Sequence, residues 1–531
     1  MKLILDKISK SLYSDICYNK DYSKIYKIHK YWARKPWYIV EKYIQHYSVL
    51  GDLVLDPFCG SGCTGLEAVI NGRNFRGQDL NPIALEVTRG TLLNTVDLLS
   101  LEMEMALISA ECKGKIMDLY KADEICPTCG GHKYFKFLNV GPKFSGNISG
   151  CVYCPCCNKK SQKRGLNENE SNQLESLKSL KPEKWVPDTK FPVKFYKDRF
   201  SYKNIHKVTD MYTSRNLYAL AELYDAIQKV KGRNHRLFLL AFTNTILHVS
   251  KLKGENVRPL GVNNYWVPDD YIEENVWFRF EDRVRNLLDA KFEQLKRENE
   301  KREIGLPYGK WNVIKKSATK SMGNETVDYV FTDPPYGDAI QYSELSFMWN
   351  AWLEKTFQIE NEVIINPVQK KTDSTFEKLL FKALKNIYQA LKPEKYFTLC
   401  FQNKNSKIWK SVISYCKELG FQLIDTSIYD TYGSPFNKSW ANFSPKSDIY
   451  VTFKKTNKSE IMFYKRNEDI ETIIKEIASY MESNKISKNN NKLYDLTISY
   501  LIWAMFYNEE EINVQGFDIK KFTQIANKVL G

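Results

Sequence analysis

The sequence lacks any run of about eighteen consecutive apolar residues, the length at which a segment becomes a candidate membrane-spanning helix. Its first residues, Met1 to Asp15, are interrupted by charged and polar side chains and do not have the pattern of a secretory signal. No internal repeat is present. With 531 residues the chain can hold two or three domains, so we expect a folded cytoplasmic protein without membrane contact.

Disulfide bonds are not expected, because twelve cysteines are too few and too unevenly spaced for a chain of this length. Six of them lie between Cys126 and Cys157. Cys126-Pro-Thr-Cys129 and Cys154-Pro-Cys-Cys157 are CxxC pairs about 25 residues apart, and four such thiolates can enclose one structural Zn²⁺. Two alternatives stay open: Cys151-x-x-Cys154 as one of the pairs, and reduced cysteines without metal.

Charge is unbalanced toward the basic side, with 78 Lys and Arg against 63 Asp and Glu, a net charge of +15 and a pI near 9.0. This suits a polyanionic partner, because phosphate contacts by Lys and Arg release counterions. A chain rich in Lys, Asn and Ile throughout reaches the same balance without such a partner. The charge therefore permits nucleic acid binding but does not establish it.

Strand and helix patterns alternate in two separate parts of the chain, which is typical of a parallel sheet with helices on both faces. The first part has a strand at 52–56, a helix at 66–71, a strand at 74–78 and a helix after Pro82. The second has a strand at 327–332, a helix at 374–392, a strand at 396–401, a helix at 406–419 and strands at 421–429 and 448–454. We therefore predict an interrupted α/β fold.

Four parts follow from this pattern. They are 24–111 and 324–455 as the two halves of the α/β domain, 112–323 as an insert, and 456–531 as a helical tail. An insert of about 210 residues usually forms a domain with its own role. It is expected to hold the cysteine pairs, a polar linker or loop at 161–184, and helices near 208–231, 234–252 and 270–300.

A glycine-containing turn follows the first strand and reads Asp56-Pro57-Phe58-Cys59-Gly60-Ser61-Gly62-Cys63-Thr64-Gly65. Glycines let the backbone approach a ligand, and the following helix offers free N–H groups. Asp79 ends the next strand, where a carboxylate can accept hydrogen bonds from both hydroxyls of a ribose. This order of elements predicts a nucleoside-type ligand.

The spacing of Gly60, Gly62 and Gly65 matches a dinucleotide fingerprint. Asp56 argues against a dinucleotide, because its carboxylate lies where the pyrophosphate would pass, and it suits the cationic, amine-bearing end of S-adenosylmethionine instead. The turn resembles the cofactor motif of the DNA amino-methyltransferases, Asp-Pro-Phe-x-Gly-Ser-Gly-Thr, with Cys63 in place of the threonine.

A second motif, Thr332-Asp333-Pro334-Pro335-Tyr336-Gly337, follows an apolar strand in the second half. A carboxylate and a backbone carbonyl that accept the two N–H bonds of an aromatic amine would make its nitrogen nucleophilic enough to attack a methyl group directly. Two prolines fix φ and remove donors, and Tyr336 offers a face on which an extruded base can stack. A proline-stiffened turn without catalytic function is the alternative.

Both motifs together resemble the prokaryotic N6-adenine and N4-cytosine amino-methyltransferases of the Asp-Pro-Pro-Tyr type, with a zinc-ribbon-like insert. The resemblance implies a Rossmann-like, S-adenosylmethionine-dependent α/β fold and the catalytic residues Asp333, Pro334, Pro335 and Tyr336. It implies cofactor contacts at Asp56, Pro57, Phe58, Cys59, Gly60, Gly62, Asp79, Leu80 and Asn81. The segment Tyr31–Pro36 resembles one that precedes the cofactor strand in large prokaryotic DNA methylases, which adds Tyr31, Trp32 and Lys35 at the methionine end of the cofactor.

The motif order, with a large insert between the motifs, resembles the subset that places DNA target recognition there. Asp333 favours adenine N6, because cytosine-N4 relatives often carry serine at this position. No Pro-Cys-Gln is present, so the covalent route of the cytosine C5 enzymes has no nucleophile. The alternatives are cytosine N4, then RNA guanine N2, then an inactive zinc-containing DNA-binding protein.

Double-stranded DNA is the expected partner, which implies association with the nucleoid, and a restriction or phage-defence partner is compatible with the sequence. In the insert, Arg258–Trp266 mixes Arg, Asn and aromatic residues that can read or wedge bases, although an ordinary packed loop has the same composition. Trp185 and the segments 212–216 and 437–444 are weaker candidates for DNA contact.

Overall fold

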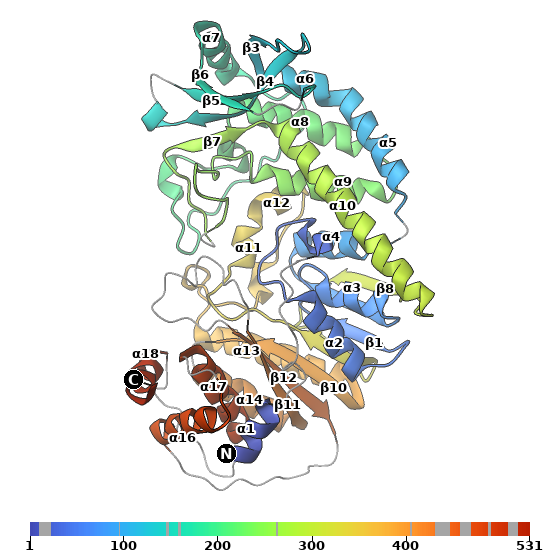
Figure 1. Ribbon diagram of the computed structural model, residues 1–531, viewed down its shortest axis with the longest axis vertical. Coiled ribbons are helices and arrows are strands. Elements are labelled where there is room, and N and C mark those ends of the chain that lie inside the picture. The colour runs from blue at the N-terminus through green and yellow to red at the C-terminus, as the bar shows by residue number, and fades with distance from the viewer. Residues whose placement is uncertain are drawn as a thin grey trace.

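The computed structural model describes residues 1–9, 23–94, 96–144, 148–157, 161–261, 264–403, 406–430, 447–456, 469–486, 490–507 and 519–530. The molecule is elongated, with a large sheet and the C-terminal helices at one end and a small sheet at the other (Figure 1). None of the helices in these ranges is long and apolar enough to cross a membrane.

The large sheet has seven strands in the order β11-β12-β10-β9-β1-β2-β8. They are β1 Leu53–Asp56, β2 Asn74–Asp79, β8 Trp311–Lys315, β9 Val327–Thr332, β10 Leu391–Phe401, β11 Phe421–Asp430 and β12 Ser447–Lys455. Only β12 runs antiparallel to its neighbours. The chain builds outward from β1 in both directions, and ligands bind where the strand order reverses, at the carboxyl ends of β1 and β9. The expected α/β, Rossmann-like fold class is confirmed.

Alternate residues of the central strands point to opposite faces of this sheet. Val54 and Tyr329 share a core with α2 (Trp37–Tyr47) and α3 (Cys63–Ile70). Leu55 and Val330 share a core with α13 (Asp373–Ala390) and α14 (Ser406–Glu418) on the other face. Successive side chains of a strand point to opposite faces, so the apolar runs of β1 and β9 place these strands in the middle of three layers.

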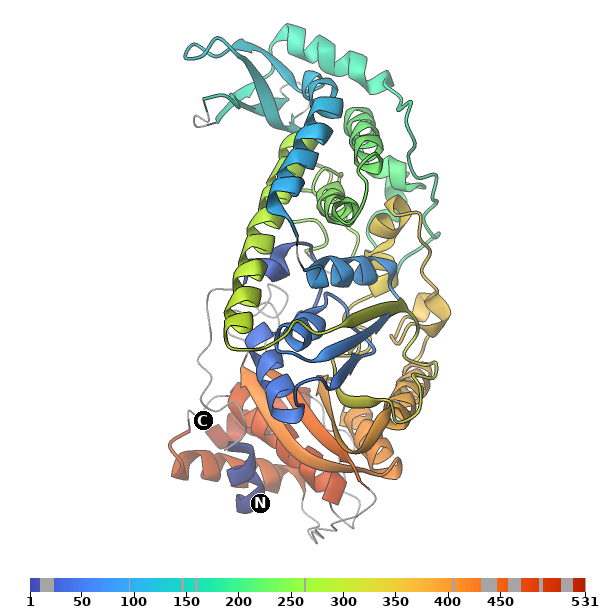
Figure 2. The ribbon, with the colours of Figure 1, turned by 90° about the vertical axis from the view of Figure 1, so that its right-hand side faces the viewer.

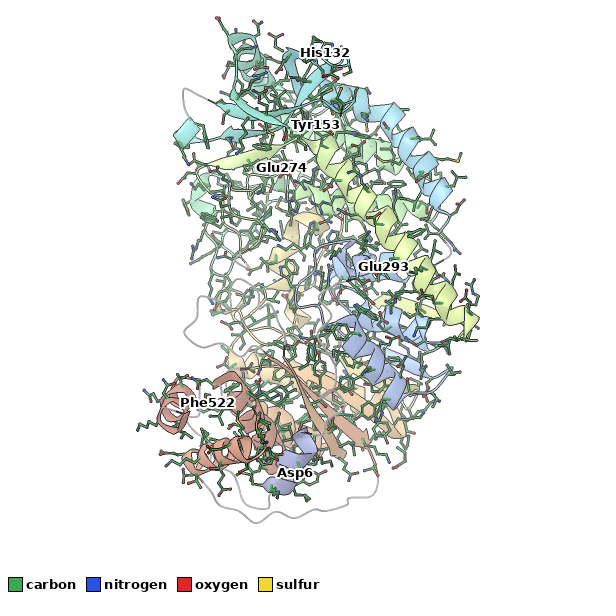
Figure 3. All side chains as sticks on the ribbon, viewed as in Figure 1. Asp6, His132, Tyr153, Glu274, Glu293 and Phe522 are labelled. Atoms are coloured by element: carbon green, nitrogen blue, oxygen red, sulfur yellow. The ribbon has the colours of Figure 1, made fainter. Side chains whose placement is uncertain are left out.

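The C-terminal tail is helical, as expected, and packs against the sheet together with the N-terminus. Its helices are α16 (Ile470–Ser483), α17 (Asn490–Tyr507) and α18 (Ile519–Leu530), and they join α1 (Lys2–Ser9). The hydroxyl of Tyr480 donates to Asp6 at 2.9 Å, and the indole of Trp503 donates to Thr426 of β11 at 2.7 Å. Asp6 and Phe522 mark the two ends of the chain in this unit (Figure 3).

The insert contains a second, antiparallel sheet. Its strands are β3 Lys121–Ile125, β4 His132–Val140, β5 Ser149–Tyr153, β6 Gln162–Gly165 and β7 Tyr271–Glu274, with β7 pairing β4. Its longer helices are α8 Ser214–Gln228, α9 Asn234–Ile246 and α10 Val276–Glu303, and α5 (Leu98–Ile108), which precedes the range expected for the insert, packs with them. These four helices share one core with α4 (Pro82–Leu92) and α12 (Phe347–Trp352) of the α/β part.

Three details of the insert differ from the sequence expectation. The stretch 161–184 contains β6 and α7 (Glu168–Ser176), because Asn167 and Glu170 form a capping box and Arg164 pairs with Glu170 at 2.7 Å. The helix expected near 270–300 begins only at Val276, after β7 has paired with β4. Strand β8 lies inside the range expected for the insert, yet it pairs with β2 in the large sheet.

Helix α10 connects the two sheets along one side of the molecule, beside α5 (Figure 2). At its start, Asn275 accepts a hydrogen bond from the amide of Phe278 at 3.2 Å and donates to the carbonyl of Phe135 in β4 at 3.1 Å. Near its end, Arg297 makes two hydrogen bonds to the buried Glu67 of α3, at 3.0 and 2.8 Å. Glu274, at the end of β7 just before this helix, and Glu293 within it are labelled in Figure 3.

Candidate active site

One cavity lies at the carboxyl ends of β1, β2 and β9, where the topology predicts a ligand site. The expected cofactor residues that line it are Tyr31, Trp32, Lys35, Asp56, Pro57, Phe58, Cys59, Gly60, Asp79, Leu80 and Asn81. Of the expected catalytic residues, Asp333 and Pro335 line it. Gly62, Pro334 and Tyr336 do not, although Tyr336 contacts Asp333 directly.

The turn after β1 requires glycine at two positions. Gly60 and Gly62 have φ values of +50° and +81°, in the region that residues with a Cβ rarely adopt. A Cβ on Gly62 would lie 3.0 Å from the Cα of Thr88 in α4, and one on Gly60 would lie 3.0 Å from the ring of Tyr31. Gly62 therefore serves the close packing of α4, while Gly60 lets the backbone reach the cavity.

Asp79 and Asp56 present carboxylates to the cavity. Asp79 accepts hydrogen bonds from the amides of Gly60 at 2.9 Å and Asn81 at 2.8 Å, one on each oxygen. Burial raises the pKa of Asp79 to about 6 and that of Asp56 to about 6, against the opposing effect of hydrogen bonds to each group. Each carboxylate oxygen has lone-pair capacity for a second donor, so the hydroxyls of a ribose can still bind Asp79.

A hydrogen bond joins the turn after β1 to the end of β9, which are the two segments expected to hold the cofactor motif and the catalytic motif. Asp56 accepts from the hydroxyl of Thr332 at 2.8 Å and from the amide of Phe58 at 3.1 Å on one oxygen, and from the hydroxyl of Thr64 at 2.8 Å on the other. Because β1 and β9 are adjacent and parallel, Asp333 directly follows this contact. The turn of one motif and the acid of the other thus open into the same cavity.

The residues of the cavity fit S-adenosylmethionine. The indole N–H of Trp32 is buried in the cavity wall and has no hydrogen-bond partner among the described residues. A buried donor without a partner is costly, so a polar ligand group is the natural acceptor. Asp79 suits two hydroxyls, Asp56 suits a cationic end, and the backbone at Gly60 leaves room for the ligand.

Asp333, which the sequence predicts to be catalytic, is part of a buried charged cluster. It accepts a hydrogen bond from the hydroxyl of Tyr336 at 2.5 Å, and its other oxygen lies 3.3 Å from the ammonium of Lys35. The same ammonium donates to the hydroxyl of Tyr336 at 2.7 Å and lies 3.2 Å from a carboxylate oxygen of Asp448. The sequence associates Lys35 with the cofactor; in the structure it lines the cavity, and its ammonium lies between Asp333 and Asp448.

Opposing effects act on the protonation of this cluster. Burial raises the pKa of Asp333 to about 7, although Lys35 and the hydroxyl of Tyr336 act in the other direction. Burial alone would lower the pKa of Lys35, but Asp333 and Asp448 raise it well above its ordinary value. Lys35 therefore stays charged, while Asp333 titrates near neutral pH.

Several cavity residues escaped the sequence analysis. Ser317 and Ala318 follow β8, whose residues Trp311–Lys315 were assigned to the insert. Glu362 also lines the cavity and accepts hydrogen bonds from the amide and hydroxyl of Ser343, at 2.8 and 2.6 Å. Asp448, which contacts Lys35 outside the cavity lining, carries no motif that would identify it.

The four cysteines expected to bind metal do converge. The sulfur atoms of Cys126, Cys129, Cys154 and Cys157 lie within 4.8 Å of one another, close to the roughly 3.8 Å between sulfurs that tetrahedral Zn–S bonds of about 2.3 Å require. Hydrogen bonds from the backbone at Thr128 and Cys129 lower the pKa of Cys126 to about 6, which favours a thiolate. Cys151 is buried in β5 and is not one of these four residues, so the second CxxC pair of the cluster is formed by Cys154 and Cys157.

Several residues of two expected DNA-contact segments are buried, while Arg258 is exposed. Tyr265, in the segment Arg258–Trp266, is buried against Phe191, Phe195 and Phe200. In the segment 212–216, residues Tyr212, Arg215 and Asn216 are buried, and Arg215 pairs with Glu273 at 2.6 Å. Trp185 is partly exposed and packs on Tyr224. The segment 437–444 and residues 262–263 lie outside the described residues.

The solved structures similar to this chain have low sequence identity and low TM-scores against it. An S-adenosylmethionine-dependent methyltransferase from Methanosarcina mazei is 10% identical over 31% of this chain and 79% of its own, with a TM-score of 0.17. A candidate DNA modification methylase from Thermus thermophilus, complexed with S-adenosyl-L-methionine, is 12% identical over 40% of this chain and 89% of its own, with a TM-score of 0.16. Neither adds to the assignment at these scores.

Sequence relatives are more informative. The type II methyltransferase M2.DpnII of Streptococcus pneumoniae is 41% identical over 63 residues, which are 12% of this chain and 24% of that relative, so only about a quarter of its length is matched. A family model described as DNA methylase matches residues 6–89 and 327–525, more than half of the chain, and includes the tail that the motifs left unassigned. The chain belongs to the DNA methylase family.

Proposed function

We propose that this protein transfers a methyl group from S-adenosylmethionine to the N6 amino nitrogen of adenine in double-stranded DNA. The observation that carries the proposal is the shared cavity, in which the hydrogen bond from Thr332 to Asp56 joins the cofactor turn to the strand that ends at Asp333. Membership of the DNA methylase family and the basic net charge of +15 support DNA as the substrate.

The residues of the cavity have separate roles in this reaction. When bound, S-adenosylmethionine supplies a methyl group on a positively charged sulfur. Asp79 binds the ribose hydroxyls and Asp56 attracts the cationic end of the same molecule. Asp333 accepts an N–H bond of the target amine, which increases electron density on the nitrogen and aligns its lone pair. The low polarity of the buried site strengthens each of these contacts.

Adenine N6 is preferred to cytosine N4 because of the aspartate at position 333. Relatives that methylate cytosine N4 often carry serine there, and the family model covers both reactions. Digestion of methylated DNA to nucleosides separates N6-methyladenine from N4-methylcytosine. A product that contains only N4-methylcytosine would assign the enzyme to the other base and leave the remaining roles unchanged.

The four-cysteine cluster is proposed to hold one structural Zn²⁺. All four ligands are supplied by the protein, so no position is left open for catalysis. Apparent Zn²⁺ binding of roughly 10–16 kcal/mol can fold a small loop-rich unit such as this sheet. The insert as a whole, which is held to the α/β part by α10, is proposed to recognise the DNA target.

Transfer of tritium from labelled S-adenosylmethionine tests the proposed activity. Double-stranded DNA should become labelled, and Asp333→Ala should abolish labelling, because the amine then loses its acceptor. Asp373→Ala, an exposed aspartate at the start of α13, is the matched control and should keep wild-type labelling. Labelling of tRNA or rRNA with unlabelled DNA would overturn DNA as the substrate.

A further inference from the structure

Lys35 is buried between two carboxylates from distant parts of the chain. Its side chain is 7% exposed, and its ammonium lies 3.3 Å from Asp333 after β9 and 3.2 Å from Asp448 in β12. It also lies 5.1 Å from the ring centre of Tyr336. Among the described residues, Lys35 is the one cation within ion-pair distance of Asp333. A buried charge is costly unless it is paired, and here both carboxylates pair with Lys35.

The two oxygens of Asp333 have different partners. One accepts the hydroxyl of Tyr336, and the other faces Lys35. Each of these oxygens has lone-pair capacity for a second donor, and Asp448 holds Lys35 from its other side, so a target amine can donate to Asp333 while Lys35 stays in place. The ammonium can then keep one oxygen fixed while the other is presented to the amine.

Lys35 and Asp448 act in opposite directions on the charge of Asp333. A protonated carboxyl offers a weaker acceptor to an amine N–H, so methyl transfer needs Asp333 ionised. The positive charge of Lys35 favours the ionised form, and the like charge of Asp448 opposes it. The other titratable groups that face Asp333 are Tyr336, Tyr342, Cys400 and Tyr450.

We propose that Lys35 is a positioning residue that holds Asp333 ionised and correctly oriented for the target amine, and that Asp448 anchors Lys35 and moderates its effect. The role of Lys35 rests on the proposed methyl transfer. In that step the lone pair of the amine forms the N–C bond while the C–S bond breaks with its electron pair on sulfur. The nitrogen then releases one proton, for which Asp333 is the nearest base.

Three variants test this assignment through the pH dependence of single-turnover methyl transfer. Lys35→Met should move the acidic limb of the rate profile upward by about 1–3 pH units, the range by which an adjacent cation lowers a carboxyl pKa. Asp448→Asn should move the limb downward, because it removes a like charge. Lys35→Arg keeps the charge and should retain the wild-type limb at a reduced rate.

Cofactor binding separates this role from the one expected for Lys35 from the sequence. S-adenosylhomocysteine should bind to the Lys35→Met protein within about threefold of wild type. A much weaker binding with an unmoved limb would make Lys35 a cofactor ligand and overturn the proposal, as would an Asp448→Asn limb that stays or moves upward. Thermal unfolding identifies any variant that fails to fold. If Lys35→Met does not fold, the separate Lys35→Arg and Asp448→Asn variants test the proposal.

Failure of the proposed DNA methylation has a different signature. Wild-type protein would then leave DNA unlabelled, whatever the variants do. If wild type labels RNA instead, the same three profiles are measured on RNA, and opposite shifts for the two charge-removing variants still support the role of Lys35. If wild type labels no nucleic acid, the proposed function and the role of Lys35 in it both fall.

Discussion

Thr332 donates a hydrogen bond from its buried hydroxyl to Asp56 at 2.8 Å, across 276 positions of sequence. It joins the last residue of β9 to the last residue of β1, so the contact spans the point at which the strand order reverses. Asp56 thereby has a fixed orientation toward the cavity. The two motifs are separated by the whole insert, but sheet pairing makes them immediate neighbours.

Thr332→Val tests this link, because valine keeps the branched shape and removes the hydroxyl. We expect S-adenosylhomocysteine to bind several-fold more weakly and the protein to lose about 1–3 kcal/mol of unfolding free energy, the usual effect of an unmade buried hydrogen bond. Thr332→Ser retains the hydroxyl and should bind close to wild type. Calorimetric titration and denaturant unfolding measure both quantities, and wild-type affinity in the valine variant would contradict the link.

Cofactor affinity should depend on pH. Asp56 and Asp79 both have pKa values raised by burial to about 6, and both must be ionised to attract a cation or to accept two hydroxyls fully. Affinity for S-adenosylmethionine should therefore rise from pH 5 to pH 7.5. Asp79→Asn should weaken binding at every pH and flatten the rise. A steeper rise in this variant would show that Asp79 is not one of the titrating groups.

The stability of the protein without cofactor should fall as the pH rises, whereas its affinity for the cofactor should rise. Because the folded pKa values of Asp56 and Asp79 lie above the ordinary value of about 3.9, the folded state binds these protons more tightly than the unfolded chain. Their contribution to stability is therefore fully present below about pH 3.9, declines between about pH 3.9 and about pH 6, and is lost above that range. Saturating cofactor should reverse this trend, which thermal unfolding with and without the ligand can measure.

The motifs could be predicted because their geometry is local. The turn after β1 and the segment after β9 are each contiguous, and an acid at the end of β2 reaches the same edge of a parallel sheet. Asp448 could not be predicted, because it reaches Lys35 only through the position of β12 between β10 and β11. A tertiary arrangement of this kind leaves no signal in residue spacing.

Composition was misleading where aromatic residues had two possible roles. Tyr265 was a candidate for DNA contact, but it is buried in an aromatic core. The polar stretch 161–184 suggested a loop, but local caps and an ion pair order it as β6 and α7. Burial of a side chain depends on what packs over it from elsewhere in the chain, and spacing alone cannot give that.

Metal removal should affect the insert alone. Cys126→Ser/Cys129→Ser should lose the one Zn²⁺ per chain that we expect, because two of the four thiolates are gone. Cys156→Ser is the matched control and should keep the metal, since Cys156 is exposed and lies outside the four-sulfur cluster. Metal analysis measures the zinc content of both proteins.

Loss of zinc should also uncouple DNA methylation from cofactor binding. The four cysteines lie just beyond the ends of β3 and β5 in the small sheet, which is at the opposite end of the molecule from the large sheet that borders the cavity (Figure 1). The double serine variant should bind S-adenosylhomocysteine normally but label DNA poorly, with new proteolytic cleavage in residues 121–165. Normal DNA labelling without zinc would contradict a role of this sheet in target recognition.

The ion pair between Arg297 and Glu67 should be the main attachment of α10 to the α/β part. Glu67 is fully buried and accepts two hydrogen bonds from Arg297 and one from Tyr26. Arg297→Met leaves this carboxylate without its cation, which should cost about 3–5 kcal/mol of unfolding free energy. Arg297→Met/Glu67→Leu removes both charges and should recover much of that loss, as denaturant unfolding can measure.

The loss of unfolding free energy in the Arg297→Met protein should depend on pH. Burial already raises the pKa of Glu67, and Arg297 opposes that rise. Without Arg297 the pKa should rise further, so that Glu67 is protonated at pH 5 and carries an unpaired buried charge at pH 8. The loss of stability should therefore be larger at pH 8 than at pH 5. An equal loss at both values would mean that Arg297 stabilises α10 through its packing on the ring of Trp37, 4.2 Å away, and not through its charge.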